Sequence, residues 1–176
     1  MTTKRRRDHL VSRLWRARRG AVAIEFGLVA LPLVLMLAAV LEIGIMLLHS
    51  VTLHGALEEG ARQLRTGQVF NSGNPRQTFE DAVCGDGLLM FDCADLVFDV
   101  RNYGDYGSVN LTPPTLGGDG LPQSPSFAPG DAGDITVARV YARYHFATPL
   151  IGAFFNDDGY DSRLIAYAAV VKGEPW

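Results

Sequence analysis

Cysteine is scarce in this sequence of 176 residues, which contains only Cys84 and Cys93. The two do not form a C-x-x-C pair and no second pair of ligands accompanies them, which argues against a zinc site or a thioredoxin-like redox centre. The four histidines are scattered, and the five-residue spacing of His49 and His54 places them on different faces of a helix. We therefore predict no metal site.

Recognisable catalytic patterns are also lacking. Serine, histidine and aspartate show no arrangement typical of a nucleophilic site. The sequence GGDG at 117–120 neither follows a strand nor opens a helix, so it predicts no phosphate-binding loop. Residues 156–162, NDDGYDS, resemble a calcium loop only loosely because Phe154 stands where the first acidic ligand should be, and a turn between the last two strands is favoured. We expect no enzyme, no catalytic residue, no cofactor and no small-molecule substrate.

The net charge is small, −3, but it is unevenly distributed. Eight basic residues and Asp8 give residues 1–20 a formal charge of +7, so the remaining 156 residues carry −10. An acidic body would repel a phosphate backbone, which argues against a nucleic-acid partner. A short basic head on an acidic body points to a membrane instead.

Residues 21–48 form a 28-residue apolar run in which Glu25 and Glu42 are the only charged residues. As a helix the run would be about 42 Å long, enough to cross a hydrocarbon layer of about 30 Å once. The basic residues before it place the N-terminus in the cytoplasm and the chain after about residue 49 on the far side of the membrane.

Three fates of this N-terminus lead to different functions. A secretory signal peptide has an apolar region of about 7 to 15 residues, shorter than residues 26–41 here, and no clean cleavage motif follows. Retention as an uncut anchor is the second fate. The third is trimming just before the apolar run, and the sequence RRG-AVAIEF, in which Gly20 precedes Ala21, Glu25 and Phe26, resembles the processing site of type IV pilin-like proteins.

The position of Glu25 has a physical interpretation of its own. An ionised carboxylate in lipid costs several kcal/mol unless it is paired, so Glu25 is a candidate functional group. Cleavage after Gly20 would create an α-amine on Ala21 that neutralises Glu25 within one chain or in a neighbouring one. The alternative is that Glu25 extends to the nearby cytoplasmic interface. Glu42, about 25 Å further along the helix, is interpreted as a glutamate at the outer interface.

Beyond the apolar run, a stripe with helical spacing predicts that the helix continues to Gly67, which offers a stop. Asn74 and Pro75 then predict the cap and first turn of a second helix. The residues expected to be buried on these two helices are Leu53, Ala56, Leu57, Gly60, Ala61 and Leu64 on the first and Phe79, Ala82 and Val83 on the second.

Cys84 and Cys93 flank a short glycine-containing segment. Outside the cytoplasm such a pair most simply forms a disulfide, with a redox or metal site as the rival interpretation. Residues 96–101, 135–146 and 164–171 have the character of strands. Residues 104–134 form a long loop rich in glycine and proline, either a recognition surface or a flexible connection. Together these features predict an α+β fold, with a long helix on a small antiparallel sheet in a pilin-like architecture.

With these features in this order along the sequence, the chain resembles the TadE-like family, the minor pilins or pseudopilins of the tight-adherence (Tad, Flp-type, type IVc) pilus system. The resemblance is carried by RRGAVAIEF, LEIG, EEGARQLRTGQV, the two cysteines followed by LVFDV, a strand ending in TPLIG at 148–152, and the closing VVKGEPW. The major pilin of that system is much shorter. TadG-like relatives carry a von Willebrand-type domain for which this chain has neither the length nor the DxSxS metal motif.

The resemblance implies cleavage by a prepilin peptidase and residence in the bacterial inner membrane as a single-pass protein, with the N-terminus in the cytoplasm and the C-terminal domain in the periplasm. It implies a role in priming or supporting pilus assembly and thereby adhesion, and leaves two locations open, incorporation into a surface pilus or residence in the membrane. Its partners would be inner-membrane lipids, the peptidase, other minor pilins and the assembly platform. The alternatives are an uncut anchor that presents a periplasmic binding module through the long loop, or a pseudopilin of a related secretion system.

The expected organisation has four parts. They are a basic cytoplasmic leader (1–20), a transmembrane segment (21–48), an amphipathic helical extension (49–67) and a periplasmic α+β domain (68–176).

Overall fold

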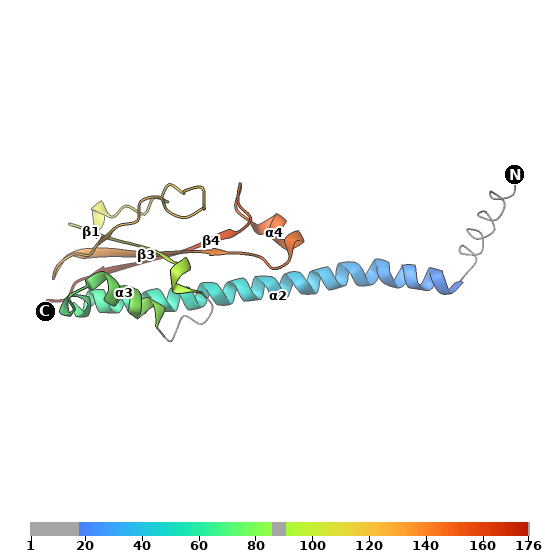
Figure 1. The fold of residues 1–176 in the computed structure, drawn as a ribbon, viewed down its shortest axis with the longest axis horizontal. Helices are drawn as coiled ribbons and strands as arrows, with labels where there is room; N and C mark the ends of the chain where they lie inside the picture. Colours follow the sequence, from blue (N-terminus) through green and yellow to red (C-terminus); the bar gives the residue numbers. More distant parts are fainter. Residues whose placement is uncertain (1–17, 86–90, 176) are drawn as a thin grey trace. The chain divides into compact units, whose positions relative to one another are not determined.

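The computed structural model describes residues 18–85 and 91–175 (Figure 1). The chain divides into two compact units, Met1–Glu42 and Ile43–Trp176. The expected basic leader lies outside the described residues except for its last three positions. The elements are α2 (Arg18–Arg65), η1 (Gln68–Asn71), α3 (Pro75–Cys84), η2 (Cys93–Asp95), β1 (Val97–Tyr103), η3 (Tyr106–Ser108), β2 (Phe127–Ala128), β3 (Ile135–Tyr144), α4 (Pro149–Phe155) and β4 (Arg163–Lys172).

Helix α2 is 48 residues long and includes both the apolar run and the amphipathic stretch after it. The helix ends at Arg65, and Gly67 follows with a φ of 72°. This left-handed conformation is accessible to glycine without a steric penalty, which is why glycine commonly ends helices. The predicted stop at Gly67 is therefore confirmed.

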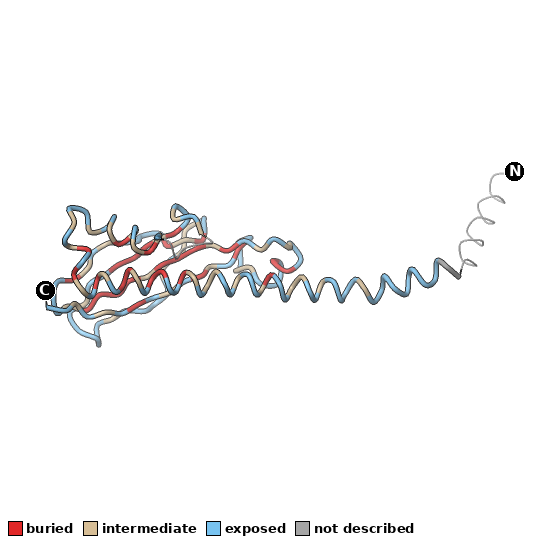
Figure 2. The backbone as a smooth tube through the Cα atoms, turned by 90° about the horizontal axis from the view of Figure 1, so that it is seen from below, coloured by how far each residue is buried: buried red, intermediate tan, exposed pale blue. Residues whose placement is uncertain are grey.

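In the unit Ile43–Trp176, the predicted stripe on α2 is buried along its whole length (Figure 2). It forms one apolar core with a single face of the sheet, because side chains at alternate strand positions point to the same side. The sheet residues of this core are Phe98, Val100, Ala138, Val140, Ala142, Tyr144, Ile165 and Ala169.

The sheet has the strand order β2-β1-β3-β4. β3 pairs antiparallel with β1 and with β4, where the register runs from Ile135 opposite Lys172 to Tyr144 opposite Arg163. The three predicted strands are present with ends that differ by one or two residues. A fourth strand, the two-residue β2, was not predicted, and it pairs in parallel with β1. The α+β class is confirmed, and the sheet is mixed.

Helix α3 begins as predicted. Pro75 is in its first turn, and the side chain of Asn74 accepts a hydrogen bond from the backbone N–H of Gln77 at 3.2 Å. Phe79 and Val83 are buried, whereas Ala82 is only partly covered. α3 packs closely on α2 at Gly60, where a Cβ atom would lie 2.6 Å from Val83 Cγ2 and 2.8 Å from Phe79 Cε2.

Residues 148–152, predicted as the end of a strand, form the start of α4 instead. β3 ends at Tyr144, and Pro149 occupies the first turn of the helix. Proline lacks the N–H that a strand would need and has a φ that suits a first helical turn, so the signal was in the sequence. The predicted turn at residues 156–162 is present, and it joins α4 to β4.

Candidate functional site

The four residues of the predicted processing site lie in the first turns of α2. Gly20, Ala21, Glu25 and Phe26 are all exposed, and a Cβ atom built on Gly20 would meet nothing within 4 Å. Ala21 and Glu25 are four residues apart, so they share one helix face about 6 Å apart along the axis. The arrangement leaves a carboxylate and the candidate α-amine position on the same exposed surface.

The part of α2 in the unit Met1–Glu42 exposes an almost continuous apolar surface. Residues 20–65 form a helix long and apolar enough to span a membrane, judged by length and composition. Such a surface is unfavourable in water and suits lipid or other apolar helices. The large side chains that are at least half exposed are Val22, Ile24, Phe26, Leu28, Val29, Leu31, Leu33, Val34, Met36, Leu37, Val40 and Leu41.

The second acidic residue of the apolar run differs from the first. Glu42 has a relative exposure of 6% and makes polar or electrostatic contact within the chain, whereas Glu25 is exposed. Burial of a carboxylate is costly unless it has partners, which Glu42 has. Of the two glutamates, Glu25 is therefore the one whose carboxylate faces outward.

The two cysteines form a disulfide, Cys84–Cys93, as predicted. It joins the last residue of α3 to the first residue of η2, with their Cα atoms 5.7 Å apart. Most of the segment between them, residues 86–90, lies outside the described residues. Both cysteines pack against the apolar core of the unit Ile43–Trp176, so the link holds α3 and the start of β1 together at the core.

Replacing both cysteines with alanine is expected to lower the free energy of unfolding by about 2.5 to 3 kcal/mol, because the short loop is no longer closed in the unfolded chain. Alanine keeps an apolar group at each position. Chemical denaturation of the full chain in detergent micelles measures the effect, and reductant should destabilise the parent chain but leave the double variant unchanged. Equal stability of parent and variant would contradict a structural role for the link.

His49 and His54 make separate ring contacts. His49 packs edge-on against Phe91 and Tyr144, with ring centroids 4.8 Å and 5.1 Å apart, while His54 contacts Tyr167. Within residues 18–85 and 91–175, no group of three or more histidine, cysteine, aspartate or glutamate side chains is placed to hold a metal ion.

The sheet face turned away from α2 holds a polar cluster that sequence reasoning missed. Asp99, only 4% exposed, accepts hydrogen bonds from Arg101 Nε at 2.8 Å, from the Ser126 N–H at 2.9 Å and from Arg139 Nη1 at 3.3 Å. The guanidinium groups also donate to loop carbonyls, Arg101 to Ser124 and Arg139 to Asn110. We call Asp99, Arg101 and Arg139 the Asp99 cluster.

The Asp99 cluster attaches the long loop 104–134 to the sheet. The loop lies on the side of β1 and β3 opposite α2 (Figure 1, yellow). The hydrogen bond and the charge of Asp99 raise the pKa of Arg101 above its usual value, so the guanidinium group of Arg101 remains ionised. Two sequence features could have indicated this cluster: the aspartate in the middle of LVFDVR and the arginines on one face of β3.

A second buried arginine fixes the turn before β4. The Arg143 side chain is 7% exposed and lies 2.8 Å from Asp157 through Nη1, and Nε donates to Ser162 Oγ at 2.9 Å. Its guanidinium stacks on Tyr160, 4.5 Å from the ring centroid. Asp157 also accepts from the Leu164 N–H at 2.7 Å, so this carboxylate links the turn to the start of β4.

The geometry thus offers an apolar helix with an outward carboxylate near its start, and polar clusters engaged in holding a loop and a turn. One comparison with known proteins agrees with this arrangement.

Residues 20–62 match the TadE-like protein family model.

The match confirms the predicted resemblance over this segment. The TadE-like segment contains all four residues of the predicted processing site and most of α2, and it ends before η1 and the sheet. The match supports a pilus-associated structural protein. Comparisons with curated proteins and with solved structures found no match.

Proposed function

We propose that the chain is a minor pilin or pseudopilin of the Tad pilus system, which primes or supports pilus assembly and thereby adhesion. The observation that carries the proposal is the TadE-like match over residues 20–62. It coincides with an apolar helix of spanning length and an exposed glutamate near its start.

In this proposal, residues 1–20 are a cytoplasmic leader that a prepilin peptidase removes between Gly20 and Ala21. Residues 21–48 cross the bacterial inner membrane, residues 49–67 extend the helix, and residues 68–176 form the periplasmic domain. The basic leader supports this orientation because basic residues are retained on the cytoplasmic side.

Glu25 would meet an α-amine when the helix packs beside other pilin helices. Cleavage after Gly20 makes Ala21 the first residue of α2, so its α-amine is close to Glu25 of the same chain or of a neighbour in a filament. A carboxylate near the start of a helix is also favoured by the helix dipole. The pairing would offset the cost of holding Glu25 in an apolar environment during extraction from the bilayer.

Substitution of Gly20 by valine is expected to abolish cleavage, because the peptidase recognises the glycine before the scissile bond. The measurement is intact mass and N-terminal sequencing of protein recovered from host membranes. The parent chain should begin at Ala21 and the Gly20→Val variant should keep its leader.

Gly27→Val is the matched control, since Gly27 also lies in α2 with nothing within 4 Å of a built Cβ atom. It carries the same change in helix propensity seven residues away and should be cleaved like the parent. A start before Gly20 in the parent would favour an uncut anchor, and a start near Val40 would mean a secreted soluble domain. Either result would overturn the proposed processing.

A further inference from the structure

Two contacts fix how the outer part of α2 lies along the sheet in the unit Ile43–Trp176. At one end of the sheet, the backbone N–H of Glu174 donates to the carbonyl oxygen of Arg65 at 2.8 Å. At the other end, the ring of His49 lies against Tyr144, the last residue of β3. The end of the sheet at Tyr144 therefore lies beside the part of α2 where the apolar run finishes.

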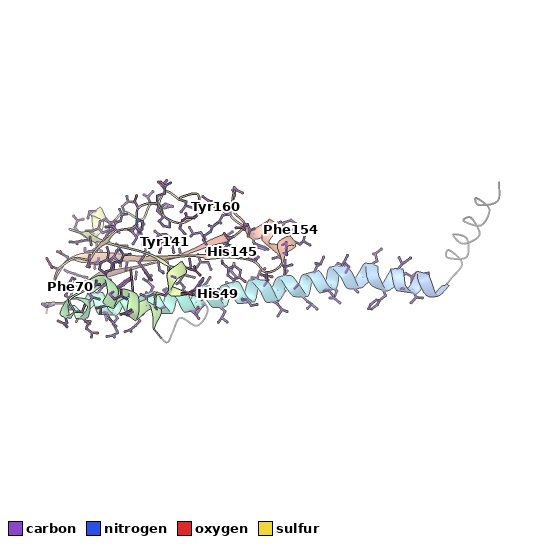
Figure 3. The ribbon with its side chains drawn as sticks, in the orientation of Figure 1. His49, Phe70, Tyr141, His145, Phe154 and Tyr160 are labelled. Carbon is purple, nitrogen blue, oxygen red and sulfur yellow. A yellow bond between two sulfur atoms is a disulfide. The ribbon has the colours of Figure 1, made fainter. Side chains whose placement is uncertain are left out.

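Ring contacts continue from this end of the sheet to α4. Phe146 packs edge-on against Tyr144 with centroids 5.0 Å apart, and Phe155 packs on Phe146 at 6.0 Å. A Cβ atom on Gly152 of α4 would lie 3.3 Å from Phe146 Cβ. Figure 3 shows Phe154 on α4, at the end of the unit where β3 finishes and farther from the C-terminal end of α2 than His145. α4 is thus placed past His49, level with the last turns of the apolar run.

Both elements expose apolar side chains at this end. α4 has the sequence PLIGAFF without a charged residue, and Phe154 is 80% exposed and Leu150 52% exposed. On α2, within the same unit, the large side chains that remain about half exposed are Ile45, Leu47 and Leu48.

We propose that α4 is a second membrane contact, which lies in the boundary between headgroups and acyl chains beside the point where α2 leaves the bilayer. The inference rests on the proposed membrane span of α2. A helix of about 42 Å exceeds a hydrocarbon layer of about 30 Å, so the last turns of the run reach headgroup depth. Exposed phenylalanine and leucine at that depth are typical of elements that lie in the membrane interface.

The partner is a lipid surface recognised by apolar contact and not by charge. The charged groups around α4 include Arg163, whose Nη1 donates to the carbonyl oxygen of Phe155 at 3.2 Å, and the exposed side chains of His145 and Asp161, 3.8 Å apart. Asp158 is also exposed, and Asp157 pairs with Arg143. This neighbourhood carries no excess of basic groups that would select anionic lipid. Contact with neutral phosphatidylcholine should therefore be as strong as with a mixture that contains phosphatidylglycerol.

The test uses single tryptophans in the full chain, reconstituted in phosphatidylcholine vesicles that carry bromine near the carbonyl end or near the methyl end of the acyl chains. Trp15 and Trp176, the only natural tryptophans, are first replaced with phenylalanine. A tryptophan is then placed at Phe154, at Leu37 in the apolar run, or at Tyr106 in η3. Tyr106 is 64% exposed and is the matched control for an exposed aromatic position distant from α4 in the chain.

We expect bromine near the carbonyl end of the acyl chains to quench the fluorescence of Phe154→Trp most strongly. This variant should also emit at shorter wavelength than Tyr106→Trp, whose fluorescence should not be quenched. Leu37→Trp should be quenched mainly near the methyl end. Quenching at position 37 without quenching at 154 would overturn the α4 contact and leave the proposed span intact. Absence of quenching at both positions would overturn the span and the inference together, and equal quenching at 106 and 154 would overturn the assignment to α4.

Discussion

A Glu25→Gln variant is expected to insert into the membrane like the parent chain but to lose most of its incorporation into the pilus machinery. Glutamine keeps the size and polarity of the side chain and removes its charge. Insertion should not suffer, since an amide costs less than a carboxylate in lipid. The α-amine of Ala21, with an ordinary pKa of about 7.7 to 8.0, is mostly protonated at pH 7 and would lose its partner.

The size of the loss follows from the charge pair. Two unit charges about 4 Å apart attract by about 4 kcal/mol at an effective dielectric constant of about 20. Loss of even half of this attraction would weaken association with a neighbouring helix by more than about tenfold. Pilus number on cells and co-purification with other minor pilins measure the effect.

Glu58→Gln is the matched control, because Glu58 is an exposed glutamate on the same helix outside the apolar run. It makes the same chemical change and should leave assembly unchanged. Glu25→Asp, which keeps the charge, should restore part of the function. Normal pilus formation by Glu25→Gln would refute the charge-pairing mechanism, even if the leader is still removed.

The parts of the fold that sequence predicted well are those set by neighbouring residues. The α2 stripe that includes Leu57 and Leu64 follows from the helical period, and the start of α3 follows from Asn74 and Pro75. The disulfide followed from the count and the expected compartment of the cysteines. Each of these inferences needed only a short stretch of sequence or the amino-acid composition.

The features that were missed depend on partners far apart in the sequence. Asp99 accepts hydrogen bonds from Ser126 and Arg139, which lie 27 and 40 residues away, so no local sequence pattern predicts the cluster. β2 has only two residues and exists because the loop is held beside β1. The long loop was expected to be a recognition surface or a flexible connection. The Asp99 cluster bonds it to the sheet at Asn110, Ser124 and Ser126, which argues against a freely flexible connection, while a recognition surface stays a prediction.

The TadE-like match and the sheet lie in different parts of the chain. The TadE-like match covers α2 almost alone, while the loop, the sheet and the disulfide lie outside it. Variants at Gly20 and Glu25 should therefore change processing or assembly without loss of the core. Variants in the sheet should first lower the free energy of unfolding.

An Asp99→Ala variant is expected to lower the free energy of unfolding by about 3 to 5 kcal/mol, because removal of one partner leaves a buried charge unpaired. The Arg139 side chain is 11% exposed and would lose its carboxylate. Arg101, with 46% exposure, can turn to water and adds little. The Ser126 N–H would also lose its acceptor, so the loop 104–134 should become more accessible to chymotrypsin at Tyr106 and Leu111.

The control and the double variant separate this mechanism from a general effect of lost charge. Asp158→Ala removes an exposed carboxylate and should change stability by less than about 0.5 kcal/mol. Combining Asp99→Ala with Arg139→Met should recover much of the loss, because a buried ion pair replaced as a whole by apolar groups is often neutral in stability. Denaturation of the full chain in micelles gives all three values. If the double variant is no more stable than Asp99→Ala alone, the unpaired arginine is not the cause, and the lost hydrogen bond to Ser126 must account for the effect.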